Sequence, residues 1–271
     1  MSEPLHVNGW ELRELLRGVA FAAARRTDMS ENVRAIHLHA TEGRFHAMAT
    51  DGHRLALMSC ALPAMPRLGL PFCSFSIDDA PMLYEACRSP VPIEVRWEPN
   101  GLAISGGRLD TPCKLDPAPN EGIPRDYATV PRIFPTEWMG ELRGSANRWA
   151  RQLTHQCTAN LDGTNKARVT ATESGLELWV NDNLDRPMGR LGGVWRGGEA
   201  FTPRALNRFY LLEAIASAPG DAVVLRFAAD PTASITITTP DEPAWACALM
   251  PVLLAAESTP PLRLLQGGRT A

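Results

Sequence analysis

The sequence of 271 residues contains an internal repeat with a spacing of about 130 residues, which limits the possible folds more than any other feature. Four short segments recur in the same order at offsets between 128 and 131 residues. A single match of this length is weak, whereas four in order at nearly one spacing indicate a duplicated domain. The matches are Glu11–Arg13 with Glu141–Arg143, Ala40–Glu42 with Ala171–Glu173, Leu83–Ala86 with Leu211–Ala214, and Val95–Trp97 with Leu225–Phe227.

Hydrophobic periodicity predicts the same order of elements in both units: a helix, short strands, a second helix and further strands. In the first unit, helices are expected over 10–26 and 77–88. In the second unit they are expected over 136–153 and 202–217. The predicted fold class is α+β, with antiparallel sheets and two helices on one face in each of two repeated domains.

The start of the last predicted helix carries a capping pattern. Thr202 is expected as its N-cap and Pro203 as its first helical residue.

The composition excludes strongly basic and membrane-spanning proteins. With 27 Lys and Arg against 30 Asp and Glu, the net charge is −3, so any nucleic-acid contact must come from local patches. No apolar run approaches the roughly 18 residues of a membrane span, and the N-terminus lacks a signal-peptide pattern. Six cysteines without metal-binding spacing are typical of a reducing compartment, so a cytoplasmic protein is expected.

Two groups of residues offer weak alternatives with catalytic or metal chemistry. His37 and His39 point to one face of a predicted strand, and His46 would lie opposite His39 on the next strand. Three histidines on one sheet face are a conceivable zinc site, although a solvated outer face explains them as well. Asp51 and His53 flank a turn without a nucleophile to serve. We expect no enzyme activity and no cofactor.

Ala49–Ala56, with the sequence ATDGHRLA, joins two predicted strands through a tight turn at Asp51-Gly52. This segment resembles the motif that opens the middle domain of the bacterial DNA polymerase III β sliding clamp. Ile123–Pro131 resembles the interdomain segment of that family, with one residue inserted at Arg125, and Ala248–Val252 resembles its closing strand. The resemblance covers roughly residues 4 to 254.

The resemblance implies a DNA clamp fold in which residues 1–128 match the middle domain and 129–254 the last domain. Residues 255–271 would form a flexible C-terminal extension, whose leucines at 262, 264 and 265 could dock into an apolar groove. The family is a processivity factor that encircles duplex DNA without sequence preference. It tethers DNA polymerase, clamp loader and repair proteins through short apolar motifs.

Family resemblance also assigns a partner-peptide pocket, position by position. A flexible methionine and small aliphatic residues make an adaptable apolar surface for many partners. The matching residues are Thr50, Gly52, His53, Arg54, Leu55, Pro124, Val130, Thr232, Ser234, Ala248, Met250, Pro251 and Val252.

The chain departs from the family pattern in four respects. The first domain is absent, the chain continues beyond the closing strand, and the lysines of the inner helices are missing. Thr129 stands where the family usually has an arginine, which puts the peptide preference in doubt. With two domains per chain, a six-domain ring requires three chains, so a homotrimer is expected.

Arginines on the outer arcs of the predicted helices are expected to face DNA. Their number is small enough for the protein to slide, because many fixed phosphate contacts would stop movement. The predicted DNA-facing residues are Arg13, Arg17, Arg25, Arg143, Arg148, Arg151, Arg204 and Arg208. The alternative to a ring is a non-ring clamp paralogue that binds clamp-binding peptides and competes with, or modulates, the host replication machinery.

Overall fold

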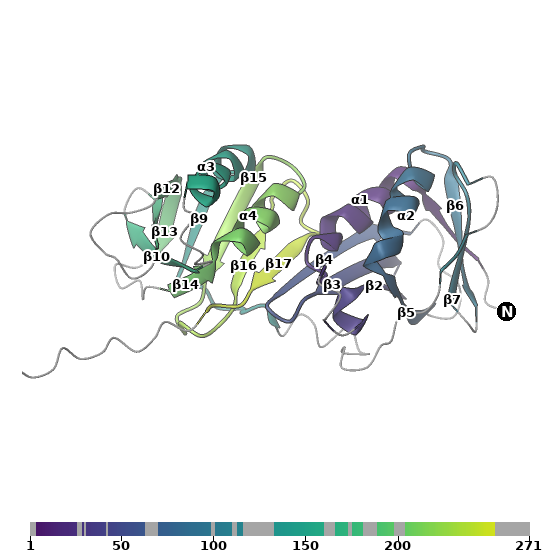
Figure 1. Ribbon diagram of the computed structural model, residues 1–271, viewed down its shortest axis with the longest axis horizontal. Coiled ribbons are helices and arrows are strands. Elements are labelled where there is room, and N and C mark those ends of the chain that lie inside the picture. Colours follow the sequence, from purple (N-terminus) through teal and green to yellow (C-terminus); the bar gives the residue numbers. More distant parts are fainter. Residues whose placement is uncertain are drawn as a thin grey trace, which may run out of the picture.

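The computed structural model describes residues 4–25, 29, 31–41, 43–62, 70–98, 101–109, 113–115, 133–159, 166–172, 175–180, 189–197 and 204–252. Two α+β halves lie side by side, with their helices on the same side of the sheets (Figure 1). The predicted domain boundary at 128/129 and the predicted extension 255–271 lie outside the described residues.

Each half contains strands arranged around two helices. The first half consists of β1 (Leu5–Asn8), α1 (Gly9–Ala20), β2 (Ala35–Thr41), β3 (Arg44–Thr50), β4 (Arg54–Ala61), β5 (Leu70–Ser76), α2 (Ala80–Ala86), β6 (Pro92–Glu98), β7 (Gly101–Gly106) and β8 (Cys113–Leu115), with 3-10 turns at Glu31–Arg34 and Ile77–Asp79. The second consists of β9 (Gly140–Ser145), α3 (Ala146–Ala159), β10 (Lys166–Thr172), β11 (Gly175–Val180), β12 (Gly189–Gly192), β13 (Val194–Gly197), β14 (Arg204–Asn207), α4 (Arg208–Ser217), β15 (Ala222–Phe227), β16 (Ile235–Thr238) and β17 (Ala246–Leu249).

The sheet order repeats between the halves. The order β1-β6-β7-β8 in the first half corresponds to β9-β15-β16-β17 in the second, and β5-β2-β3-β4 corresponds to β14-β10-β11-β12. Three of the four sequence matches fall on equivalent elements, namely β2 with β10, α2 with α4, and β6 with β15. The fourth match is wrong, because Glu11 lies on α1 whereas Glu141 lies on β9.

The predicted helix 136–153 is the largest error of the sequence interpretation. Residues 140–145 form strand β9, and the helix begins only at Ala146. A Cβ at Gly144 would lie 2.2 Å from the Trp149 ring, so glycine lets that ring pack against the strand. Leu142 points into the core as a strand residue. Because it precedes Ala146 and Trp149 at the spacing of one helical face, the sequence pattern predicted a single helix.

The other helices also have boundaries that differ from the predicted ones. Helix α1 ends at Ala20, and the second predicted helix is a 3-10 turn followed by α2 at Ala80–Ala86. The last helix begins at Arg208 with Asn207 as its N-cap, and the predicted cap residues Thr202 and Pro203 lie outside the described residues. The Asn207 side-chain oxygen accepts hydrogen bonds from the backbone N–H groups of Phe209 and Tyr210.

The two halves share one sheet of nine strands, which runs in the order β13-β9-β15-β16-β17-β4-β3-β2-β5. Its central link is the antiparallel pair β17–β4, in which Ala248 lies opposite Leu55. Beside this link, the buried Trp245 donates a hydrogen bond of 2.7 Å from its indole N–H to the carbonyl of Gly18 in α1. A Cβ at Gly18 would approach the Met58 sulfur to 2.3 Å, so glycine lets α1 lie close to β4.

Among the described helices, none has the length and hydropathy needed to cross a membrane.

Candidate functional site at the junction of the two halves

Strand β4 presents different residues to the two faces of the shared sheet. Ala56 and Met58 point toward α1 and belong to the main core. Leu55 and Leu57 point to the opposite face, because side chains alternate along a strand. There they form a separate buried cluster with Met48 of β3 and Ala248 of β17, against which Phe134 packs. We call these five residues the outer apolar cluster.

The ATDGHRLA segment forms the predicted hairpin corner between β3 and β4. Gly52 has a φ of 87°, a conformation that favours glycine. The Asp51 carboxylate accepts hydrogen bonds from the backbone N–H groups of His53 and Arg54 at 2.9 and 3.0 Å. Thr50 donates its hydroxyl to the Arg54 carbonyl at 2.6 Å. The corner is therefore fixed by its own side chains before any partner contacts it.

The corner also holds the closing strand of the second half in place. The backbone N–H of Met250 donates a hydrogen bond of 2.8 Å to the carbonyl of His53. The exposed imidazole of His53 stacks on the ring of Tyr210 in α4, with ring centroids 6.2 Å apart. The junction thus brings together six of the predicted pocket residues: Thr50, Gly52, His53, Leu55, Ala248 and Met250.

Arg54, which the resemblance assigned to the pocket, does not belong to the outer apolar cluster. Its side chain is only 6% exposed and points to the helix side of the sheet, one step out of phase with Leu55. The guanidinium forms ion pairs with Asp51 at 3.0 Å and with Glu213 of α4. It also lies 4.3 Å from the centroid of the Tyr210 ring. Arg54 therefore joins the two halves and does not line the outer apolar cluster.

The charge of this junction also acts on Tyr210. Burial raises the pKa of the Tyr210 phenol, and the nearby Asp51 carboxylate raises it further against the opposing charge of Arg54.

The remaining pocket residues differ in their positions. Ser234 is buried, and its hydroxyl donates a hydrogen bond of 2.7 Å to the carbonyl of Ile133, next to Phe134. Thr232 is exposed in the loop before β16 and bonds to Asp230. The described chain ends at Pro251 and Val252, whose N–H donates to the Ala205 carbonyl at 2.9 Å. Pro124 and Val130 lie outside the described residues.

Three residues of the outer apolar cluster were absent from the prediction: Met48, Leu57 and Phe134. The alternation of side chains along β3 and β4 could have identified the first two. Leu57 lies two residues after Leu55 and so points to the same sheet face, and Met48 is the cross-strand partner of Leu57. No local pattern identifies Phe134, because only the tertiary fold carries its segment to this sheet face.

The three histidines share a sheet face, as the strand periodicity predicted. His39 pairs with His46 across β2 and β3, with ring centroids 6.4 Å apart. His37 is buried, and its Nδ1 lies 2.6 Å from the hydroxyl oxygen of Ser74. Within the described ranges, no three His, Cys, Asp or Glu side chains form a group that could hold a metal ion.

The predicted DNA-facing arginines fall into distinct groups. Arg13, Arg17 and Arg25 lie on α1 or just after it, and Arg148 and Arg151 lie on α3. All five are at least partly exposed on the helix side.

Two other arginines do not lie on the helix surface, and a third lies on a strand with its side chain outside the described part of the chain. Arg208 is buried at the start of α4 (2% exposed), so its guanidinium is not on the helix surface. Arg143 lies on β9, in phase with Glu141 and out of phase with the core residue Leu142, and therefore faces away from the helices. Arg204 lies on strand β14, and its side chain is not among those that the structure describes.

Arg143 instead belongs to an ion-pair cluster on the outer sheet face. It contacts the Glu141 carboxylate at 2.8 Å, and Arg226 approaches the same carboxylate at 3.5 Å. Burial would raise the pKa of Glu141, but hydrogen bonds and charge from the two arginines outweigh it and lower that pKa.

No protein-family model matches the sequence, and no curated protein matches it. Solved structures of bacterial clamps are nevertheless similar to it. A DNA polymerase III beta subunit from Thermotoga maritima matches with a TM-score of 0.78 and 18% identity, over 94% of this chain and 67% of that one. A DNA polymerase sliding clamp from Bacillus subtilis matches with a TM-score of 0.79 and 14% identity, over 94% and 65%.

A DnaN sliding clamp from Pseudomonas aeruginosa bound to griselimycin matches with a TM-score of 0.79 and 18% identity, over 93% of this chain and 66% of that clamp. The chain therefore spans about two thirds of the length of these proteins. Over nearly all of its own length, the chain has the fold of the bacterial DNA polymerase III beta sliding clamps.

Proposed function

We propose that this protein is a sliding-clamp-like processivity factor, which encircles duplex DNA and tethers DNA polymerase and repair proteins through the outer apolar cluster. The observation that carries this proposal is the junction itself. One continuous sheet joins two clamp-like halves, with helices on one side and the outer apolar cluster on the other. A molecule with this arrangement can contact DNA and a partner peptide at the same time.

The strand order supports a ring closed by three chains. Strand β17 of the second half joins β4 of the first half within the chain. In the repeated sheet order, β8 corresponds to β17, and β12 corresponds to β4. Both β8 and β12 are edge strands in the described sheets, so the same kind of pairing can join one chain to the next. Three such contacts would close six domains if each turns the chain by about 120°.

The assembly is tested by molar mass and by retention on DNA. Light scattering over a concentration series should give three times the 29.6 kDa of the chain. The trimer should remain on nicked circular DNA at high salt and slide off after linearisation, because a closed ring is held by topology. A monomer at every concentration, or equal retention on both DNA forms, would reject the ring.

A non-ring peptide-binding protein is the second candidate, and the charges of the helices favour it. Helices α1 and α4 each have no net charge, α3 carries +2, and α2 with its preceding 3-10 turn carries −3. The four together therefore carry a net charge of −1. A monomer that binds clamp-binding peptides and fails the DNA retention test would support this candidate.

Peptide binding has its own test, which uses a matched pair of exposed methionines. Met250 next to the corner is 44% exposed, and Met82 on α2 is 40% exposed. Met250→Ala should weaken binding of a fluorescent clamp-binding peptide by about fivefold, the effect of roughly 1 kcal/mol of lost apolar contact. Met82→Ala should leave the affinity unchanged. Equal affinities for the two variants would place the peptide elsewhere.

A further inference from the structure

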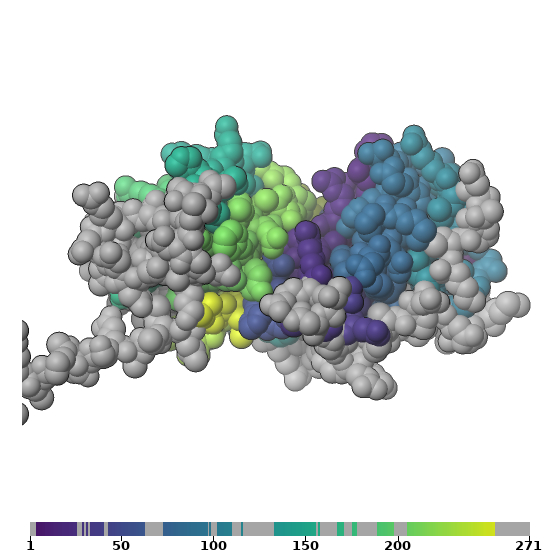
Figure 2. Space-filling view, viewed as in Figure 1, coloured from purple at the N-terminus to yellow at the C-terminus, as the bar shows by residue number. Residues whose placement is uncertain are grey.

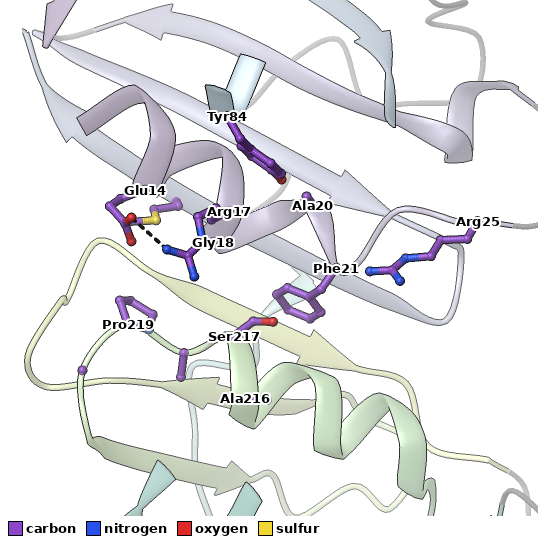
Figure 3. A pocket seen from close by; sticks show the side chains of 13 residues that line it. Glu14, Arg17, Gly18, Ala20, Phe21, Arg25, Tyr84, Ala216, Ser217 and Pro219 are labelled. Carbon is purple, nitrogen blue, oxygen red and sulfur yellow. Dashed lines mark hydrogen bonds and ion pairs between the residues drawn. The ribbon is translucent and has the colours of Figure 1, made fainter. Parts of the chain in front are cut away.

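The two faces of the junction differ in how they arrange positive charge. On the helix side, a pocket of about 430 Å³ lies between α1 and the end of α4. Figure 2 shows this hollow between the two lobes, and Figure 3 shows side chains that line it. Arg17 pairs with Glu14 at 3.2 Å, and Arg25 lies at the opposite end of the pocket. These two arginines are separated, whereas the outer sheet face gathers three arginines in one place.

The three arginines on the outer sheet face surround one carboxylate. Glu141 of β9 has Arg196 of β13 opposite it on one side and Arg226 of β15 opposite it on the other. Arg143 points to the same face, because it follows Glu141 by two residues along the strand. Side chains that lie directly opposite each other have Cβ atoms about 5 Å apart. We call Arg143, Arg196 and Arg226 the outer arginine patch.

The single carboxylate satisfies only part of the outer arginine patch. Arg143 contacts one oxygen of Glu141 through Nε at 2.9 Å and Nη2 at 2.8 Å. Arg226 reaches the other oxygen only through Nε, at 3.5 Å, and its guanidinium lies 5.9 Å from the centroid of the Trp138 ring. Arg196 is exposed and forms no ion pair within the described chain. Each guanidinium has five N–H donors, so most of these donors are open to another acceptor.

Nearby carboxylates reduce the positive charge of the patch without cancelling it. Glu141 lies at its centre, and the exposed Glu137 lies on the segment that leads into β9. Three arginines against these two glutamates leave a charge of +1. Asp230, in the loop after β15, accepts hydrogen bonds from the backbone N–H and the hydroxyl of Thr232. The patch therefore favours an additional carboxylate.

The outer arginine patch lies in line with the outer apolar cluster. One row of cross-strand partners joins them, and its successive members are Leu55, Ala248, Thr236, Arg226, Glu141 and Arg196. Neighbouring strands are about 4.8 Å apart, so Arg226 lies about 10 Å and Arg196 about 19 Å from Ala248 along this row. An extended peptide advances about 3.3 Å per residue, so about three to six residues span these distances.

The segment just before β9 connects the cluster to the patch. Phe134 packs against the outer apolar cluster, and Trp138 lies against Arg226. Between them in the row, Thr236 is only 2% exposed, whereas Arg196 is exposed. A peptide anchored on the cluster and extended along the row therefore meets accessible polar groups of the sheet at the arginines.

We propose that the outer arginine patch binds acidic residues of a partner peptide, about three to six residues away from the apolar residues that the peptide places on the outer apolar cluster. Carboxylates suit this patch because a guanidinium group donates two parallel hydrogen bonds to a carboxylate. Exposed charges at the rim of an interface act mainly on partner choice and on the rate of association. The inference rests on the proposed function, because the cluster must hold the peptide, and it adds a selection for acidic flanks.

The test uses fluorescent clamp-binding peptides that differ only in their flanks. One carries aspartates about three to six residues from the apolar anchor, and the other carries asparagines at the same positions. Both are made with the flank on the N-terminal side and on the C-terminal side. At about 50 mM salt, the full chain should bind the aspartate peptide about tenfold more tightly for one of the two sides, and about threefold at about 200 mM. Equal affinities on both sides would overturn the proposal.

Two double variants with the same change of charge locate the effect. Arg196→Gln/Arg226→Gln removes two cations of the patch and leaves Arg143 to pair with Glu141. Arg44→Gln/Arg88→Gln removes two exposed arginines elsewhere. The readout is the ratio of the affinities for the aspartate and asparagine peptides, in which a general loss of binding cancels. This ratio should fall below about twofold in the patch variant and stay near tenfold in the control. An equal fall in both would reject the patch.

A DNA duplex is the other polyanion that could occupy the patch. Displacement of the aspartate peptide, but not of the asparagine peptide, by a micromolar duplex would assign the patch to nucleic acid and overturn the proposal. Failure of the patch can also be told from failure of the proposed peptide site. An asparagine peptide that binds and responds to Met250→Ala, without any advantage for aspartate, would keep the peptide site and reject the patch. Absence of binding by both peptides would reject both.

Discussion

Individual residues at the junction have roles that their sequence motif does not reveal. The motif resemblance assigned His53, Arg54 and Leu55 to one pocket, yet strand alternation sends Arg54 to the helix side and Leu55 to the outer face. Arg54 is the more constrained of the two, because its charge is buried and depends on Asp51 and Glu213. Its contribution to stability is therefore measurable apart from peptide binding.

Arg54→Met should destabilise the protein by about 3 kcal/mol, because it leaves the buried Asp51 carboxylate without its cation. Arg44→Met is the matched control, since Arg44 lies exposed on the adjacent strand and bonds only to Ser59 in the described chain. That change should cost less than about 0.5 kcal/mol. Urea unfolding of both variants measures the difference, and equal midpoints would contradict the assigned role of Arg54.

At the scale of elements, the start of α3 depends on a carboxylate that is distant in sequence. Asp221, just before β15, accepts hydrogen bonds from the backbone N–H of Asn147, the Ser145 hydroxyl and the Asn147 side-chain amide at 3.3, 3.0 and 2.8 Å. These bonds lower the pKa of Asp221, with the backbone N–H of Asn147 as the largest cause. Helix α3 therefore begins at Ala146, six residues after the start of β9, where Asp221 can cap it.

The lowered pKa predicts a loss of stability in acid. A carboxyl group whose pKa is lower in the folded state stabilises the protein above its unfolded pKa, near 3.9, and this contribution disappears as the pH falls through the folded value. Between pH 5 and pH 2, the urea midpoint should therefore fall more for the wild type than for Asp221→Asn. Glu85→Gln, which changes an exposed carboxylate on α2, is the control and should retain the wild-type slope. Identical slopes in all three proteins would contradict the cap.

At the scale of the whole molecule, the two halves are expected to unfold together. They share the β17–β4 pair, the Arg54–Glu213 ion pair and the Trp245–Gly18 hydrogen bond. Breaking the contact between halves exposes a strand edge and leaves a buried charge unpaired. The chain should therefore show one calorimetric transition whose van't Hoff and calorimetric enthalpies agree.

Two buried tryptophans test this coupling. Trp245 donates its indole N–H to Gly18 across the junction, and Trp149 donates to Gly192 within the second half at 2.9 Å. Each change to Phe should cost about 1–3 kcal/mol, because it leaves a carbonyl without its donor. Trp245→Phe should also reduce the ratio of van't Hoff to calorimetric enthalpy, whereas Trp149→Phe should lower the Tm with the ratio unchanged. Equal ratios would show that the junction does not control cooperativity.

The sequence by itself determined the duplicated α+β organisation and the hairpin corner. Periodicity and the Asp51-Gly52 turn act over a few neighbouring residues, so they can be recognised without the fold. Three of the four repeat matches and the predicted face of the three histidines were confirmed for the same reason. The helix over 136–153 was wrong because a short strand and the following helix together imitated one apolar stripe.

Only the tertiary structure decided which side of the sheet each junction residue occupies. Phe134 reaches the outer apolar cluster, Arg54 reaches Glu213, and Trp245 reaches Gly18 across the two halves. These contacts join residues more than 75 positions apart, and no local spacing encodes them. Their cause is the pairing of β17 with β4, which fixes the register of one half against the other and thereby places every side chain at the junction.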